Sequence, residues 1–316
     1  MNTGQRNRLI VTGSLFVLLI SASIIFGPTV LLIGLVGLLT SLIIEFLASK
    51  ARKETFDWTT FWITPLIITL LTTPTIIDQV WMVAVATAFG VFFAKSIWGG
   101  QDKNVFNPAM VGLIFIALAF PIYVNSFLDP ILKVTTTSTP AFVFKNTPTA
   151  VFNSYSLWQL LLGNYAGGLG TTFKLGILVL GSILMILRIS DWKIPLTFLG
   201  TYFLFSLINF ASKGFGFDSF IYALYSLLMG HLLFAAMFVS TDPQTAPLYG
   251  KGKIYYGVAL GFITWIIQNI WLFNQLAPNT EGIIYSVTFM NAMVGLIDIW
   301  TVPKIKQVPL MEEVVE

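Results

Sequence analysis

Long apolar runs recur along the whole chain, and short polar connections separate them. A run of about 20 apolar residues crosses the roughly 30 Å hydrocarbon core of a bilayer. The pattern predicts helical segments at roughly 9–26, 29–48, 60–73, 79–98, 106–124, 173–189, 194–211, 218–240, 254–274 and 282–300. The third run is short and ends in Thr72-Thr73-Pro74-Thr75, which predicts a broken or half-spanning helix. We therefore expect an all-α polytopic membrane protein with about ten transmembrane segments.

Composition supports this class. Hydrophobic residues make up 56% of the chain and charged residues 10%, against about a quarter charged in soluble domains. The first run follows Arg6 and Arg8 as a signal peptide would, but no small-residue cleavage site follows it. We expect it to be a retained helix.

The distribution of Lys and Arg predicts the orientation. With the N-terminus in the cytoplasm, thirteen of the 17 cations fall on cytoplasmic stretches and four on outer ones. Cytoplasmic connections carry such an excess. We expect a multi-pass protein of the cytoplasmic (inner) membrane with both termini in the cytoplasm and the segment 125–172 on the outer face.

An internal repeat divides the chain. Phe106–Ile114 recurs as Phe289–Ile297 with seven of nine residues identical. A second echo, Thr72-Thr73-Pro74 and Thr241-Asp242-Pro243, stands one span before each copy. Two five-span halves account for both echoes, and because five is odd, the halves must be inverted in the membrane. The expected divisions are 1–124 and 173–303 for the two membrane repeats, 125–172 for an extracytoplasmic loop, and 304–316 for a short cytoplasmic tail.

Inverted halves with interrupted segments commonly build a substrate or ion path near the bilayer midplane. Our candidates for such a path are Asn107 and Asn291, in the two copies of the repeat, and Asp242, beside a helix break. Asp242 could equally cap the next segment. We expect Glu45 and Asp298 to reach water at cytoplasmic ends, and His231 to be a neutral packing residue inside the eighth span.

The absence of cysteine excludes iron–sulfur clusters ligated by this chain. One histidine cannot supply two axial haem ligands, and we find no nucleotide-binding motif, catalytic triad or metal-ligand spacing. If the protein handles electrons, an organic cofactor carries them.

The stretch Gly99–Gly112, with its Asn-Pro-Ala-Met core, resembles the signature of the RnfD/NqrB family, membrane subunits of ion-translocating electron-transport complexes. The resemblance continues in the family's order through Thr136–Pro140, Gly163–Thr172, Asp191–Leu196 and Ser240–Pro247. It covers the chain from about residue 55 to 300.

The resemblance implies a covalent cofactor. Members carry FMN on a threonine hydroxyl in a pattern close to Asp-x-x-Ser/Thr-x-Ala-Thr-Pro, attached by a separate flavin transferase on the outer face. Here the acceptor position matches Thr139, followed by Pro140, with Thr136 at the earlier hydroxyl position. Two positions depart from the pattern, because Lys133 replaces the aspartate and Ser138 the alanine. Thr147-Pro148 is a second candidate.

The glycine-rich stretch 163–172 opens the sixth span, and backbone amides at such a helix start can receive a phosphate. We take Gly168 and Gly170 as candidate cofactor contacts, although a flexible turn explains the glycines equally well, and Thr171 replaces the family's acidic residue here. A second, non-covalently held flavin is a further alternative.

The resemblance implies a membrane subunit of an Rnf- or Nqr-type complex that couples flavin-mediated electron transfer to Na⁺ or H⁺ translocation. Its partners would be membrane and peripheral subunits carrying flavin and iron–sulfur centres, with no nucleic acid, and the chain would not be catalytic alone. The alternatives are a small-solute channel or secondary transporter, or a non-redox assembly subunit, of the same fold without covalent flavin.

Overall fold

The computed structural model describes residues 2–73, 78, 80–137, 139–269 and 282–303. Ser138 and the tail 304–316 lie outside the described residues. Almost all regular structure in the described part is helical, with one two-stranded hairpin.

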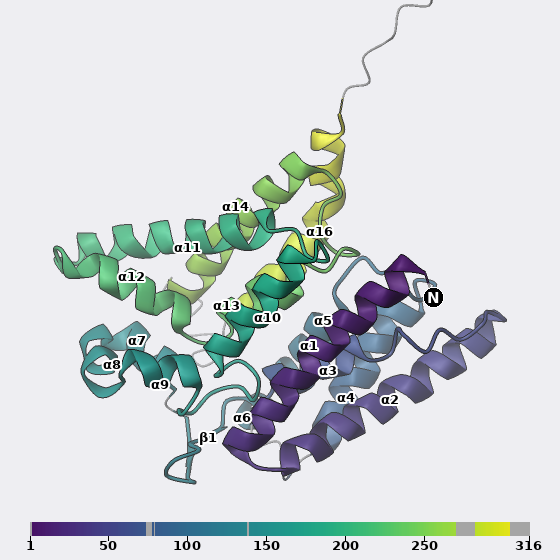
Figure 1. Cartoon of the computed structure of the whole chain (residues 1–316), viewed down its shortest axis with the longest axis horizontal. Coiled ribbons are helices and arrows are strands. Elements are labelled where there is room, and N and C mark those ends of the chain that lie inside the picture. Colours follow the sequence, from purple (N-terminus) through teal and green to yellow (C-terminus); the bar gives the residue numbers. More distant parts are fainter. Residues whose placement is uncertain (1, 74–77, 79, 138, 270–281, 304–316) are drawn as a thin grey trace, which may run out of the picture.

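The first helices gather in one group (Figure 1). They are α1 (Thr3–Phe26), α2 (Thr29–Arg52), α3 (Ile63–Leu71), α4 (Trp81–Phe89) continuing as the π-helix η2 (Gly90–Ser96), α5 (Pro108–Ala119) and the short α6 (Pro121–Val124).

The segment between the two helix groups contains only short elements and lies to one side of them (Figure 1). It holds the antiparallel strands β1 (Phe127–Leu128) and β2 (Thr135–Thr136), then α7 (Pro140–Asn146), α8 (Pro148–Ser154) and α9 (Leu157–Leu162).

A second group of long helices follows. It contains α10 (Lys174–Ile186), α11 (Lys193–Ser212), α12 (Asp218–Leu228), α13 (Leu232–Phe234) continuing as the π-helix η3 (Ala235–Val239), α14 (Gly250–Asn269) and α16 (Ile283–Thr301).

Within the described residues, four helices are long and apolar enough to cross a membrane: α1, α2, α11 and α16. The pair α12 and α13–η3 makes a fifth span, bent by 68° at its break. The other apolar helices are shorter. The prediction of an all-α polytopic membrane protein is confirmed, and every predicted run coincides with a helix, apart from 270–274, which lies outside the described residues.

The prediction of a continuous eighth span is wrong. The chain breaks between α12 and α13, where Gly230 adopts a positive φ of 57°, a conformation that glycine adopts without a Cβ clash. His231 therefore lies at a helix break and not inside a helix.

The contacts of the first group recur in the second. In the first group α1 contacts α3, α2 contacts α4, and α4 contacts α5; in the second α10 contacts α13, α11 contacts α14, and α14 contacts α16. Between the groups, α5 contacts α16 and α1 contacts α10, so equivalent helices meet. The inverted orientation of the two halves stays a prediction.

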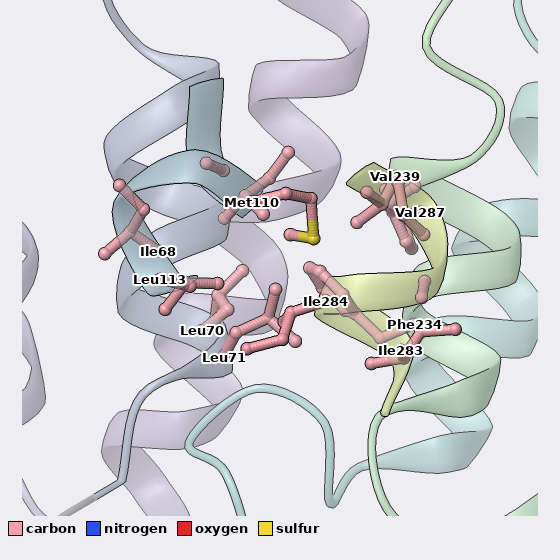
Figure 2. Packing of buried hydrophobic residues seen from close by; sticks show 14 of the residues in the cluster. Ile68, Leu70, Leu71, Met110, Leu113, Phe234, Val239, Ile283, Ile284 and Val287 are labelled. Atoms are coloured by element: carbon pink, nitrogen blue, oxygen red, sulfur yellow. The ribbon is translucent and has the colours of Figure 1, made fainter. Parts of the chain in front are cut away.

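Apolar side chains from both groups fill the space between α5 and α16 (Figure 2). Leu70, Met110 and Leu113 face Ile284 and Val287, and all of them are at most 8% exposed. The halves therefore meet across a dry hydrophobic layer.

Two cations that the charge count assigns to connections are buried. Lys95, in η2, lies 2.6 Å from the carboxylate of Glu45, and both side chains are under 10% exposed. Lys174 is fully buried and donates to the carbonyl of Gly230. The expectation that Glu45 reaches water is therefore wrong. The asymmetry of the remaining cations, twelve against three, keeps its sign.

Candidate functional site

Asn107 is positioned by the start of α5. Its Oδ1 accepts hydrogen bonds from the amides of Ala109 at 3.0 Å and Met110 at 3.4 Å, so the side chain caps the helix. Pro108 at the first helical position has no N–H to satisfy. The cap fixes the side chain, and its amide nitrogen faces Asp242 Oδ2 at 3.4 Å.

Asn291 links this cap to the second half. Its Oδ1 accepts the backbone N–H of Asn107 at 3.0 Å, and its Nδ2 donates to the carbonyl of Thr245 at 3.0 Å and lies 3.4 Å from the hydroxyl of Tyr256. Asn291 is 2% exposed in the middle of α16. A buried amide in a membrane helix is stable only with such partners.

Asp242 follows η3 in the connection to α14. One carboxylate oxygen accepts the amide of Gln244 at 3.2 Å, and the other accepts the Thr245 hydroxyl at 3.4 Å. No lysine or arginine of the described chain forms an ion pair with it. The three predicted ion-path residues, far apart in sequence, thus form one polar cluster in which Asp242 carries the unbalanced charge.

A cavity of about 250 Å³ opens onto this cluster. Its walls come from the start of α1, the start of α3, the end of α10 and the end of η3, so both halves contribute. Asp102 and Gln244 bridge the halves at its edge, with Gln244 Nε2 2.7 Å from Asp102 Oδ1. Among the described residues that line it, the one cation, Arg8, is already 2.8 Å from Asp57. The cavity is therefore electrostatically open to cations.

The apolar layer of Figure 2 lies on the other side of the cluster. Met110 and Leu113 follow Asn107 along α5, and Ile284 and Val287 precede Asn291 along α16. Because α5 and α16 contact each other there, the polar cluster is reached through the cavity and closed behind by hydrocarbon.

Thr139 lies at the start of α7. Its Oγ1 accepts the amide of Phe142 at 3.2 Å, Pro140 takes the first helical position, and Thr139 is 8% exposed. Thr136 pairs with Phe127 in the hairpin. The predicted flavin acceptor is thus a helix cap with a largely covered hydroxyl.

Lys133 stands in the turn of the same hairpin with a positive φ of 54°. Asp129 lies across this turn: its Oδ1 accepts the amides of Ile131 at 2.8 Å and Leu132 at 2.9 Å. The motif pattern does not reveal this carboxylate, because it stands four residues before Lys133. Its hydrogen bonds show that it shapes the turn.

The glycine-rich segment 163–172 packs against both broken helices. The amide of Gly170 donates to the carbonyl of Leu70 at 2.8 Å, and the amide of Leu169 to that of Thr72 at 3.0 Å. Thr171 Oγ1 lies 2.9 Å from Nδ1 of His231, which confirms a hydrogen-bonded histidine.

The lack of a side chain has a packing reason at both candidate glycines. A Cβ on Gly168 would come within 2.5 Å of the His231 ring, and one on Gly170 would overlap Leu70. Their contact with a cofactor stays a prediction.

A sequence model of the family described as "NQR2, RnfD, RnfE family" matches residues 1–307. The chain belongs to this family. It is 33% identical over 248 residues to a membrane-complex relative of Chromohalobacter salexigens, the NqrB-type subunit of a Na(+)-translocating NADH-quinone reductase. That match covers 75% of this chain and 57% of the relative, so the chain spans little more than half of its length.

Two further relatives are named as subunits of an ion-translocating oxidoreductase complex, both of the RnfD type. The one from Erwinia tasmaniensis is 28% identical over 265 residues, 71% of each chain. The one from Haemophilus influenzae is 27% identical over 333 aligned positions, 90% of this chain and 88% of the relative. The resemblance to the RnfD/NqrB family is confirmed.

The FMN that this family resemblance implies fits the structure in part. Thr139 supplies the acceptor oxygen, and the amide of Phe142 points at it. The nearest cavity, lined by Phe144 and Lys145 of α7, holds only about 40 Å³, whereas pockets that enclose a cofactor-sized ligand measure roughly 300–1,000 Å³. The residues thus suit a phosphate ester at the start of α7 and do not enclose a flavin ring.

Proposed function

We propose that the chain is the membrane subunit of an ion-translocating oxidoreductase complex, and that it carries Na⁺ or H⁺ through the Asn107–Asp242–Asn291 cluster. The observation that supports this most is Asp242, which has no cationic partner in the described chain and stands at the end of a cavity between the two halves. A carboxylate at membrane depth is costly and is retained where it has a function.

The chemistry of the cluster suits a hard cation. Besides the Asp242 carboxylate it offers the amide oxygens of Asn107 and Asn291 and the hydroxyls of Thr245 and Tyr256, and small hard cations prefer oxygen ligands. Passage outward would require the apolar layer behind the cluster to open, because an alternating path exposes its site to one side at a time.

The orientation and partners follow from this role. Both termini lie in the cytoplasm of an inner-membrane protein, and the cavity opens to the cytoplasmic side. Other membrane and peripheral subunits supply the electron donor and acceptor sites, with their flavin and iron–sulfur centres. FMN, when attached to Thr139 by a flavin transferase, would accept and release single electrons on the outer side.

Asp242→Asn is expected to lower electron-transfer-driven ion uptake about tenfold, since it removes the one negative charge of the cluster while keeping its shape. The measurement is ²²Na⁺ uptake and pH change in inverted vesicles that contain the assembled complex. Asp218→Asn is the matched control, because Asp218 is an exposed carboxylate in the first turn of α12. Wild-type ion uptake by Asp242→Asn would contradict the proposed path, and redox-independent uptake of a small solute by the wild type would favour the transporter alternative.

Thr139→Val is expected to abolish the in-gel flavin fluorescence of the denatured protein after expression with a flavin transferase. Thr147→Val is the matched control: it also precedes a proline and a short helix, but it is exposed and makes no side-chain cap. If the fluorescence disappears in Thr147→Val and survives in Thr139→Val, the accessible threonine is the acceptor. Absence of fluorescence in the wild type would contradict covalent attachment.

A further inference from the structure

A second, larger cavity lies beside the one just described and takes no part in the proposed ion path. It holds about 600 Å³ between the end of α10, the connection 187–192, the start of α11, the connection 240–249 and Lys253 of α14. All of these elements belong to the second half.

The cavity is positively charged. Three cations line it, Arg188, Lys193 and Lys253, against the single carboxylate of Asp191 among the described lining residues. Asp191 lies 2.9 Å from Lys253, which balances that pair. Arg188 and Lys193 form no ion pair within the described chain, so two positive charges are left for a ligand.

The carboxylate inside the cavity is firmly ionised. Burial acts to raise the pKa of Asp191, but hydrogen bonds from the Lys253 side chain and the Lys193 amide outweigh burial and hold the pKa below its usual range. Asp191 therefore stays paired with Lys253 and does not compete as a proton donor.

Arg188 stands where a glycine would be favoured. It follows the C-terminal end of α10 with a positive φ of 57°, a position that helices usually give to glycine. A bulky residue held in this conformation costs free energy and points to a use for its side chain.

The rim of the cavity is apolar and exposed. Ile186 is 79% exposed, Trp192 56% and Leu248 70%, and all three line the cavity. Exposed tryptophans also lie near the ends of η2 and α16, at Trp98 and Trp300, which share the predicted cytoplasmic side. Tryptophan at helix ends is typical of the headgroup level of a bilayer. Basic groups at that depth beside exposed aliphatic side chains match the two ends of a phospholipid.

We infer that this cavity binds the phosphate headgroup of an anionic phospholipid, such as phosphatidylglycerol or cardiolipin, from the cytoplasmic leaflet. Arg188 and Lys193 hold the phosphate, and the acyl chains lie against Ile186, Trp192 and Leu248. The cavity shares Thr241 and Pro243 with the wall of the ion cavity, so the bound lipid braces the connection that carries Asp242.

The test measures lipid binding to the detergent-solubilised full chain by native mass spectrometry, with phosphatidylglycerol and phosphatidylcholine of the same chain length. Phosphatidylglycerol is expected to bind more tightly, and Arg188→Gln with Lys193→Gln to weaken it about 25-fold, about fivefold for each charge. Lys50→Gln with Lys53→Gln removes two exposed cations of the same predicted side away from the cavity and is expected to change nothing. Lys193→Arg retains binding, which separates loss of charge from misfolding.

A second arm separates a lipid from a soluble phosphate. Glycerol 3-phosphate is expected to compete only at concentrations far above those of the lipid, and Trp192→Ser with Leu248→Ser is expected to weaken the lipid alone. Equal binding of phosphatidylcholine, or unchanged binding by the double glutamine variant, would overturn the proposal. Competition by glycerol 3-phosphate at lipid-like concentrations would overturn it in favour of a soluble phosphate ligand.

Discussion

Lys95→Met is expected to destabilise the folded protein by about 3–5 kcal/mol, because it leaves the carboxylate of Glu45 buried without its cation. Lys95 also donates to the carbonyl of Thr60 at 2.9 Å, and the Thr60 hydroxyl donates to Glu45 at 2.6 Å. The substitution therefore breaks a closed network that joins α2, η2 and the connection between α2 and α3. The measurement is the free energy of unfolding of the detergent-solubilised chain in a denaturant titration.

Two variants test the cause. Glu45→Leu combined with Lys95→Met removes both charges and is expected to recover most of the loss, since a buried pair replaced by apolar groups is often neutral. Glu54→Gln breaks the exposed pair with Arg52, where Glu54 is 47% exposed, and is expected to cost under about 1 kcal/mol. A single variant as stable as the wild type would mean that water reaches Glu45 after all.

The fold class and the helix positions could be predicted because apolar runs of bilayer length occur for few other reasons. The repeat likewise indicates which residues could share a path, and Asn107, Asp242 and Asn291 do meet. Their hydrogen bonds could not be predicted, since they depend on how α5, α16 and the connection after η3 approach one another. Sequence spacing carries no such distance.

The wrong predictions have a common physical cause. The charge count assigns Lys95 and Lys174 to connections, because an isolated lysine near the end of an apolar run normally reaches water. Their burial depends on partners 50 and 56 residues away, Glu45 and the Gly230 carbonyl. The helix break at Gly230 has a signal in the sequence, a glycine before the only histidine, but hydropathy alone runs through it.

The two copies of the repeat give a matched pair of glycines, Gly112 and Gly295. Gly112→Ala is expected to destabilise the chain by about 2–3 kcal/mol, because a methyl group there would overlap the carbonyl oxygen of Ala86 on the facing helix. The same close approach recurs one step along, where a methyl group on Gly90 would overlap the carbonyl of Pro108. Backbone atoms cannot turn aside as side chains do, so α4–η2 and α5 must separate.

Gly295→Ala is the control that the repeat supplies. It stands at the equivalent position in α16, is exposed, and has nothing within 4 Å of the added methyl group. Alanine there is expected to be neutral or to stabilise the helix by about 0.5–1 kcal/mol. Both variants are compared by denaturant titration of the isolated chain. Equal effects would mean that α5 is not held against α4 by a glycine contact. A large difference would show that one repeated sequence packs tightly in the first half and leaves its counterpart open in the second.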